Sequence, residues 1–426
     1  MATATASRGR RTSTTISPSE ARLRRRDETW LLELTSTPTA AGREERVMAW
    51  LDGWLRPRAK KLRIRRDDAG NYLVTRRDAR AGGAPLLITA HLDHPAFVVL
   101  DGEDAVAPRG SVWLEFRGGV HNPYFLGAAI EIIDAVGARH EAVIMRLEPD
   151  AKPYKRVLVR LSTPSARRAI VAGDIGRWRF PPPRILMRDL PGPNGSMRSV
   201  RVLETHACDD LAAVAAACAA FERMLAKSEF RDVGLLFTVA EEVGFIGAIH
   251  AAKRRFIPRK ARLLCLENSR SFPHDSPIGA GAIVRVGDRL SVFSPSLTNT
   301  ISDLLISHAK KTPTFRWQRK LMPGGACEAT AFAAFGYEST CLCLPLGNYH
   351  NMTAIDETLA AAARNLRTRG VVAPEFIALD DFHSLVEMLL VAARGLCMAR
   401  TGSHTARAHR VLMERIYTKG CGVLAG

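Results

Sequence analysis

The chain has 426 residues, of which 46% are hydrophobic and 24% charged, a composition typical of a soluble globular protein with room for two or three domains. No apolar run reaches the roughly 18 residues of a membrane-spanning helix, so the composition excludes a membrane-spanning class and we expect no membrane partner. The formal net charge of +18 would suit an anionic partner. However, the basic residues are scattered and accompany no recognisable nucleic-acid motif, so we do not expect specific nucleic-acid binding.

The eight cysteines form neither a CxxC pair nor a closely spaced framework. This pattern predicts reduced thiols and a cytoplasmic protein. The two ends of the chain are rich in basic residues, and we expect a basic disordered tail at residues 1–27 and a basic C-terminal tail at 401–426. A transit peptide is the alternative interpretation of the first segment.

Helical and strand patterns alternate along most of the chain. Two helices are expected between residues 28 and 55, followed by a hairpin at 62–64 and 72–74 and a buried strand at 86–90. In the second half, the hydrophobic pattern predicts helices at 211–226, through 250, at 298–310, at 328–335 and at 379–400. It predicts strands at 235–240, 261–266 and 340–345.

The segment 102–203 interrupts this alternation with short β-rich pieces separated by glycine and proline turns, which indicates an inserted small β-domain. The two flanking stretches, 28–101 and 204–400, would then form one discontinuous catalytic domain. We therefore predict an α/β fold in which a mixed central sheet is flanked by helices and carries the insert.

Histidines and carboxylates follow the predicted strands at the points where these strands end. They are His91 and Asp93, Asp209 and Asp210, Glu241 and Glu242, Glu267, and His350. The carboxyl ends of parallel strands open on one edge of a sheet, so we expect these side chains to meet there. Such a mixture of nitrogen and oxygen ligands suits two divalent ions of zinc, cobalt or manganese character. A shared carboxylate would hold the ions about 3.5–4 Å apart.

Each of these residues also has an ordinary structural interpretation. Asp93 could cap a strand end, Asp209 could cap the following helix, and His350 could be a hydrogen-bonded loop histidine. Glu241 and Glu242 could form a solvated acidic turn. The metal-site hypothesis therefore depends on their combination.

At these positions the sequence resembles the dinuclear metal-dependent exopeptidases, and most closely the tetrahedral and glutamyl aminopeptidases. The resemblance extends from about residue 31 to residue 394. Its most specific motif is a double glutamate followed by Val-Gly-x-x-Gly-Ala, which spans residues 241–248. Shorter matching pieces surround His91, the pair Asp209-Asp210, and His350. The resemblance implies a zinc-exopeptidase-like fold, and the insert is similar to the small β-domain of those enzymes.

Carried over position by position, the resemblance implies that His91 and Glu267 bind one metal ion and that Glu242 and His350 bind the other. Asp209 would bridge the two ions. Glu241 would be the general base that passes a proton from water to the leaving amine.

The resemblance also implies that Asp93 orients the imidazole of His91. Two departures from the family pattern bear on the site. Glu267 stands where aspartate is more usual, and Cys327-Glu328 falls where a Thr-Asp pair often lies near the substrate amine. Glu328 would then recognise a free N-terminus, or it would simply be an acid in the first turn of a helix.

We therefore expect a metallo-aminopeptidase that removes N-terminal residues from peptides, with two divalent metal ions per chain, zinc first, and a homo-oligomeric state between dimer and dodecamer. Folds and sites of this type serve several amide cleavages, so an N-acyl amino acid deacylase or other amidase is an alternative. A non-catalytic binding protein with a basic surface is the alternative from another class.

Overall fold

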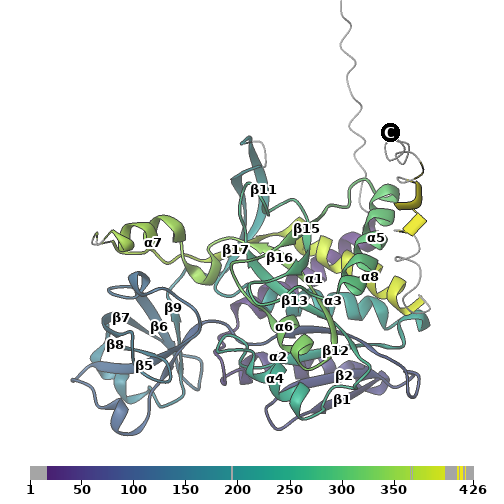
Figure 1. Ribbon diagram of the computed structural model, residues 1–426. Helices are drawn as coiled ribbons and strands as arrows, with labels where there is room; N and C mark the ends of the chain where they lie inside the picture. Colours follow the sequence, from purple (N-terminus) through teal and green to yellow (C-terminus); the bar gives the residue numbers. More distant parts are fainter. Residues whose placement is uncertain are drawn as a thin grey trace, which may run out of the picture.

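The computed structural model describes residues 17–192, 195–364, 366, 368–398, 410–411, 413–415 and 418, without the side chains of 103 and 104 (Figure 1). Most residues of the two predicted tails lie outside this part of the chain. Residues 18–27 do not belong to a tail, because α1 runs from Pro18 to Ser36. Ser17 caps this helix by accepting the backbone N–H of Glu20, and Pro18 occupies its first turn. Both are helix-start signals that the basic composition of the segment obscured.

An eight-stranded mixed sheet forms the centre of the larger part of the molecule. Its strands are, in spatial order, β1 (Leu62–Arg66), β2 (Tyr72–Arg76), β12 (Val233–Thr238), β3 (Leu86–His91), β13 (Arg262–Arg270), β16 (Glu338–Leu346), β14 (Ala282–Gly287) and β15 (Trp317–Leu321). The four middle strands, β12, β3, β13 and β16, are parallel. β2 and β14 pair antiparallel with them, so the predicted fold class is confirmed.

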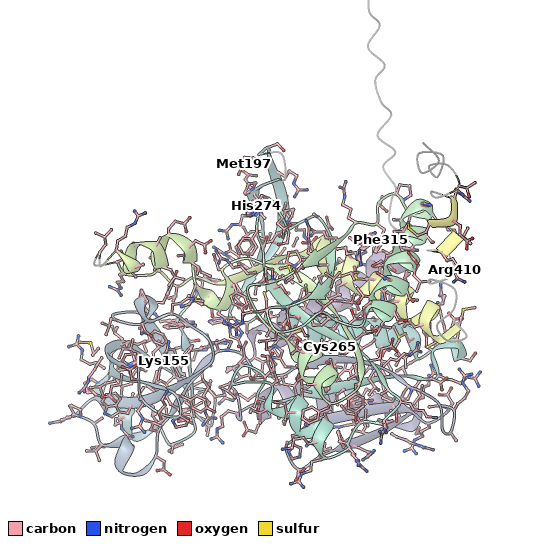
Figure 2. All side chains as sticks on the ribbon, viewed as in Figure 1. Lys155, Met197, Cys265, His274, Phe315 and Arg410 are labelled. Carbon is pink, nitrogen blue, oxygen red and sulfur yellow. The ribbon has the colours of Figure 1, made fainter. Side chains whose placement is uncertain are left out.

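Helices cover both faces of this sheet (Figure 1). On one face pack α1, α2 (Glu45–Leu55), α3 (Leu211–Met224), α5 (Pro295–Lys311) and α8 (Leu379–Met398). On the other face pack α4 (Ile246–Lys253) and α6 (Glu328–Ala334). The run of small residues in α3 is fully buried, which lets this helix approach the strands closely. Cys265 of β13 lies in the middle of these layers (Figure 2).

A closed six-stranded barrel lies beside the main sheet (Figure 1). Its strands are, in spatial order, β4 (Ala96–Val99), β5 (Ser111–Arg117), β8 (Lys155–Leu161), β7 (Arg139–Glu148), β6 (Ala129–Ile133) and β9 (Ile175–Trp178). Four aromatic side chains fill one core region in edge-to-face or tilted contact: Phe97, Phe116, Phe125 and Trp178. Five of its six strands lie within the segment 102–203, where the glycine and proline pattern predicted short strands.

The barrel and the predicted insert do not coincide. The first barrel strand begins at Ala96 and the last ends at Trp178. The remaining strands of the segment, β10 (Arg184–Pro191) and β11 (Met197–Thr205), form a projecting hairpin that pairs with β17 (Glu375–Ala378). Met197 lies near its tip (Figure 2). Alternating sequence predicts strands but not which sheet they join, so the boundary was misplaced.

A long excursion between β16 and β17 was not expected from the sequence. It contains α7 (Ile355–Ala363), which extends over the barrel side of the molecule (Figure 1). Met352 and Ile355 belong to the hydrophobic core of the barrel, so this excursion connects the barrel to the main domain. Among the described residues, no helix has the length and apolar character needed to cross a membrane.

Candidate metal centre

The structure brings all seven predicted site residues into one buried cluster at the carboxyl edge of the parallel strands. His91 is the last residue of β3, and Glu267 lies near the end of β13. Asp209 lies between β11 and α3, the glutamate pair follows β12, and His350 follows β16. These segments are far apart in sequence, and the order of strands in the sheet makes them neighbours.

The first half of the cluster surrounds Nε2 of His91. Oδ1 of Asp209 lies 3.4 Å from this nitrogen, and Oε1 of Glu267 lies 3.9 Å from it. The other ring nitrogen, Nδ1, is 3.2 Å from the backbone oxygen of Asp93. An acceptor at Nδ1 holds the proton there and leaves Nε2 free to bind a cation.

The second half surrounds Nε2 of His350. Oδ2 of Asp209 lies 3.4 Å from this nitrogen, and Oε1 of Glu242 lies 3.5 Å from it. Nδ1 of His350 is 2.7 Å from the backbone oxygen of Gly119, which belongs to the loop after β5 of the barrel. The two oxygens of Asp209 therefore face two different histidines, which is the arrangement of a bridging carboxylate.

These distances fit two metal ions. Ligand atoms that each lie about 2.0–2.1 Å from a tetrahedral zinc ion are separated by roughly 3.3 Å, and three of the four nitrogen–oxygen distances are 3.4–3.5 Å. Asp209 Oδ1 and Glu242 Oε1 are buried and have no hydrogen-bond partner among the described residues. Buried polar atoms are normally paired, so these orphaned oxygens are placed as ligands for cations.

Glu241 lies within the same cluster, where its carboxylate forms a third possible ligand group with His91 and Glu242. Its Oε2 is 3.9 Å from Nε2 of His91. Burial raises its pKa well above the ordinary value, and the charges of Glu267 and Asp93 add to this effect. A carboxyl group that holds a proton more readily than usual is suited to general acid and base chemistry.

The side chains of the cluster carry more buried acidic than basic groups. Burial, followed by the charge of Asp209, raises the pKa of Glu267 to about 7 and that of Glu242 well above its ordinary value. Burial alone would lower the pKa of His91, but the charge of Glu241 and hydrogen bonds to carboxylates raise it. Divalent cations would supply the missing positive charge.

Asp93 has a wider positioning role than the sequence indicated. Its Oδ1 lies 3.4 Å from Nδ1 of His91 and accepts the backbone N–H of Glu241 at 2.9 Å. Its Oδ2 accepts the N–H of Glu242 at 3.0 Å. One fully buried carboxylate therefore lies against the imidazole of His91 and holds the turn that carries both glutamates.

Two further supporting carboxylates were missed as site residues. Glu44 accepts the N–H of Ala240 at 2.9 Å, next to the glutamate pair. Glu375, the first residue of β17, accepts backbone N–H groups on both sides of the centre. Asp210, by contrast, uses its carboxylate to accept the His91 N–H and the side chain of Asn268. No local motif reveals these contacts, because each joins distant segments.

A cavity of about 270 Å³ opens beside Glu267. Arg285 of β14 lines it and is only 2% exposed. Its guanidinium is 3.2 Å from Ser269 Oγ, while its Nε has no partner and the described residues form no ion pair with it. Glu328, in contrast, is buried, accepts a hydrogen bond from Thr89 and does not line this cavity.

Comparison with known proteins agrees with this geometry. Residues 195–366 match the family model of the M42 glutamyl aminopeptidases. The matched segment contains five of the seven predicted site residues: Asp209, Glu241, Glu242, Glu267 and His350. No curated protein matched the chain in a sequence search.

Solved aminopeptidase structures share the fold along nearly their whole length. The TET1 peptidase of Pyrococcus horikoshii, which can assemble into a tetrahedron or a large octahedral shell, is 18% identical, with a TM-score of 0.62 over 86% of this chain and 99% of that one. The TET aminopeptidase of a marine sediment thaumarchaeon is 17% identical, with a TM-score of 0.64 over 90% and 99%. An aminopeptidase from Desulfurococcus kamchatkensis is 19% identical, with a TM-score of 0.63 over 86% and 94%. The predicted resemblance to this group is confirmed.

Proposed function

We propose that this protein is a metallo-aminopeptidase that removes N-terminal residues from peptides with two divalent metal ions and Glu241 as the general base. The match of residues 195–366 to the M42 glutamyl aminopeptidase model supports this proposal. The observation that carries the proposal is the carboxylate of Asp209, whose two oxygens each lie 3.4 Å from Nε2 of a different histidine. A binding protein has no need of such a centre with an additional acid beside it.

Two ligand sets share Asp209. His91 and Glu267 would complete the site on the β3 side, and Glu242 and His350 would complete the site on the β12 side. Bound divalent ions would polarise the scissile carbonyl and increase the acidity of water. Zinc suits this mixed set of imidazole and carboxylate ligands, and cobalt and manganese share the preference.

Glu241 would move the proton. A carboxylate oxygen of Glu241 would accept a proton from the attacking water and deliver it to the nitrogen of the departing amine. Its burial favours holding the proton between these two steps. Asp93 would keep Glu241 in place through the hydrogen bond to its backbone N–H.

The test is the variant Glu241→Gln, which keeps the shape of the side chain and removes the base. We expect the hydrolysis rate of unblocked peptides to fall about 10²–10⁴-fold, while metal analysis still finds two ions per chain. A variant with a near wild-type rate would contradict the role of Glu241. Cleavage of N-acetylated peptides by the wild-type protein would instead favour the deacylase alternative.

The cavity beside the centre supports a preference for an acidic N-terminal residue. Arg285 is a buried guanidinium with an unpartnered Nε, and a buried charge is normally paired with an opposite charge. Arg270 lines the same cavity, but its guanidinium is bound by Asp356 at 2.6 Å. Arg285 is thus the guanidinium of the cavity with which no described carboxylate forms an ion pair.

The preference is tested with the variant Arg285→Met and the matched variant Arg270→Met. Wild-type kcat/KM should be higher for N-terminal glutamate than for leucine. Arg285→Met should reduce this ratio about 10–100-fold, because a charge-assisted hydrogen bond contributes about 1.5–3 kcal/mol. Arg270→Met should leave most of the ratio intact. Equal rates on both substrates in the wild type would refute the preference.

The solved relatives with large assemblies support a homo-oligomer for this chain as well. The seven cysteines in the described part of the chain are all free, which supports a cytoplasmic location. Peptides with a free N-terminus are the expected substrates in this setting.

A further inference from the structure

Glu375 joins two segments of the candidate metal centre that are distant in sequence. Its Oε2 accepts the backbone N–H of Cys208 at 2.7 Å and that of Asp209 at 3.1 Å. Its Oε1 accepts the N–H of His350 at 2.8 Å. The side chain is fully buried. One carboxylate thus sets the distance between the bridging aspartate and the second histidine.

The turn that carries His350 needs such support. Asn348, His350 and Asn351 in this turn have φ between 52° and 63°. This left-handed conformation costs the His350 side chain roughly 1 kcal/mol, whereas asparagine adopts it more readily. Residues of this kind persist only where the surrounding structure holds them. Here the backbone N–H of His350 donates to the Glu375 carboxylate, and ring Nδ1 lies 2.7 Å from the backbone oxygen of Gly119.

Glu375 also closes the base of the excursion that carries α7. Gly347 and Phe376 exchange backbone hydrogen bonds at 2.9 and 3.2 Å, and the N–H of Ala373 donates to Asn351. Between these points the chain leaves the centre and contributes Met352 and Ile355 to the barrel core. The chain must therefore return to within hydrogen-bond reach of His350 after 25 residues, and Glu375 is where it does so.

We propose that Glu375 is a positioning residue that pre-organises the Asp209–Glu242–His350 half of the metal centre by holding the backbones of Asp209 and His350 at a fixed separation. The inference rests on the proposed function for the presence of metal ions, whereas the backbone contacts of Glu375 are observed directly. Asp93 has the equivalent role for the glutamate turn, so two buried carboxylates define the geometry of this half.

The test compares Glu375→Gln with Glu375→Asp in the full-length protein. In Glu375→Gln, one of the two carboxylate oxygens becomes an amide nitrogen, which faces a backbone N–H in either orientation of the side chain. The hydrogen bonds on that side, either to Cys208 and Asp209 or to His350, are then lost. Mutation of a residue that supports a metal ligand typically lowers metal affinity 10–100-fold. We expect zinc content to fall from two ions toward one per chain in a zinc-buffered solution, with a loss of affinity of about that size at one site.

A second measurement needs no metal. Amide hydrogen exchange in stripped protein should be faster in Glu375→Gln within peptides that cover residues 206–211 and 347–352, and unchanged in the barrel. Glu375→Asp retains both oxygens on a shorter arm and should recover part of the protection. Amide hydrogen exchange therefore tests the positioning role of Glu375 separately from catalysis, because the measurement can be made even if the protein cleaves no peptide.

The matched control is Asp381→Asn. Asp381 is also fully buried and accepts two backbone N–H groups, those of Gly279 and Gly281 at 2.6 Å, but it belongs to α8 and contacts none of the metal-site residues. The Asp381→Asn variant should retain two zinc ions and wild-type amide hydrogen exchange in the peptides that cover residues 206–211 and 347–352. Wild-type zinc content and exchange in Glu375→Gln, or the same losses in Asp381→Asn, would overturn the proposal. A wild-type protein that binds two ions but cleaves no peptide would refute only the proposed function.

Discussion

The two halves of the candidate metal centre are built differently. His91 and Glu267 are residues of β3 and β13, so the pairing of these parallel strands sets their positions. Glu242 and His350 lie in turns beyond the strand ends, and Ala240 in the first turn and His350 itself have positive φ. Buried carboxylates hold these turns by accepting their backbone N–H groups. One half thus depends on sheet geometry, and the other depends on a few specific side chains.

This difference shows where the centre is sensitive to change. A sheet register is fixed by many backbone hydrogen bonds, so no single supporting residue is decisive there. A strained turn with one supporting carboxylate can be released by one substitution. We therefore expect variants on the turn side to lose metal without loss of the fold, and variants on the strand side to lose metal only when a ligand itself is removed.

The largest effect should come from Asp209→Asn, because Asp209 belongs to both halves. One oxygen becomes an amide NH₂ group, which cannot bind a cation, and the charge that balances both ions is lost. We expect neither ion to remain after dialysis and peptidase activity to fall at least about 10³-fold. Metal analysis and circular dichroism of the same sample would check this. Retention of one tightly bound ion would show that the halves are independent.

A smaller effect is expected from Glu44→Gln on the turn side. Burial and the charge of Asp93 raise the pKa of Glu44 to about 7. A raised carboxyl pKa stabilises the fold at low pH, and this contribution is lost as the pH rises from about 4.5 through about 7. Oε1 accepts both the Gly42 and Ala240 N–H groups, so the amide oxygen of the glutamine can retain both hydrogen bonds. The substitution then removes only the titratable carboxyl group.

Stripped wild-type protein should therefore lose up to about 3 kcal/mol of unfolding free energy relative to Glu44→Gln between pH 4.5 and 8. Urea unfolding at several pH values measures this difference. The two proteins should be equally stable near pH 4.5. Parallel stability curves across the whole range would show that Glu44 does not titrate in this window.

The sequence determined the strand-borne part of this protein. Buried apolar runs predicted β3, β12, β13 and β16, and the polar residues at or beyond their ends gave six of the seven candidate side chains. The seventh, Asp209, precedes the predicted helix that became α3. This was possible because strands, their carboxyl ends and the polar residues that follow them are local features of the chain. The double-glutamate motif also indicated the resemblance to the glutamyl aminopeptidases, whose family model matches residues 195–366.

The tertiary structure alone decided the rest. The hairpin of β10 and β11 left the predicted insert to pair with β17, and the excursion with α7 packed onto the barrel. Glu44 and Glu375 each contact residues at least 25 positions away, and no local pattern distinguishes them from other carboxylates. Long-range pairing depends on which surfaces fit in three dimensions, so the residues that position the site could be recognised only in the folded chain.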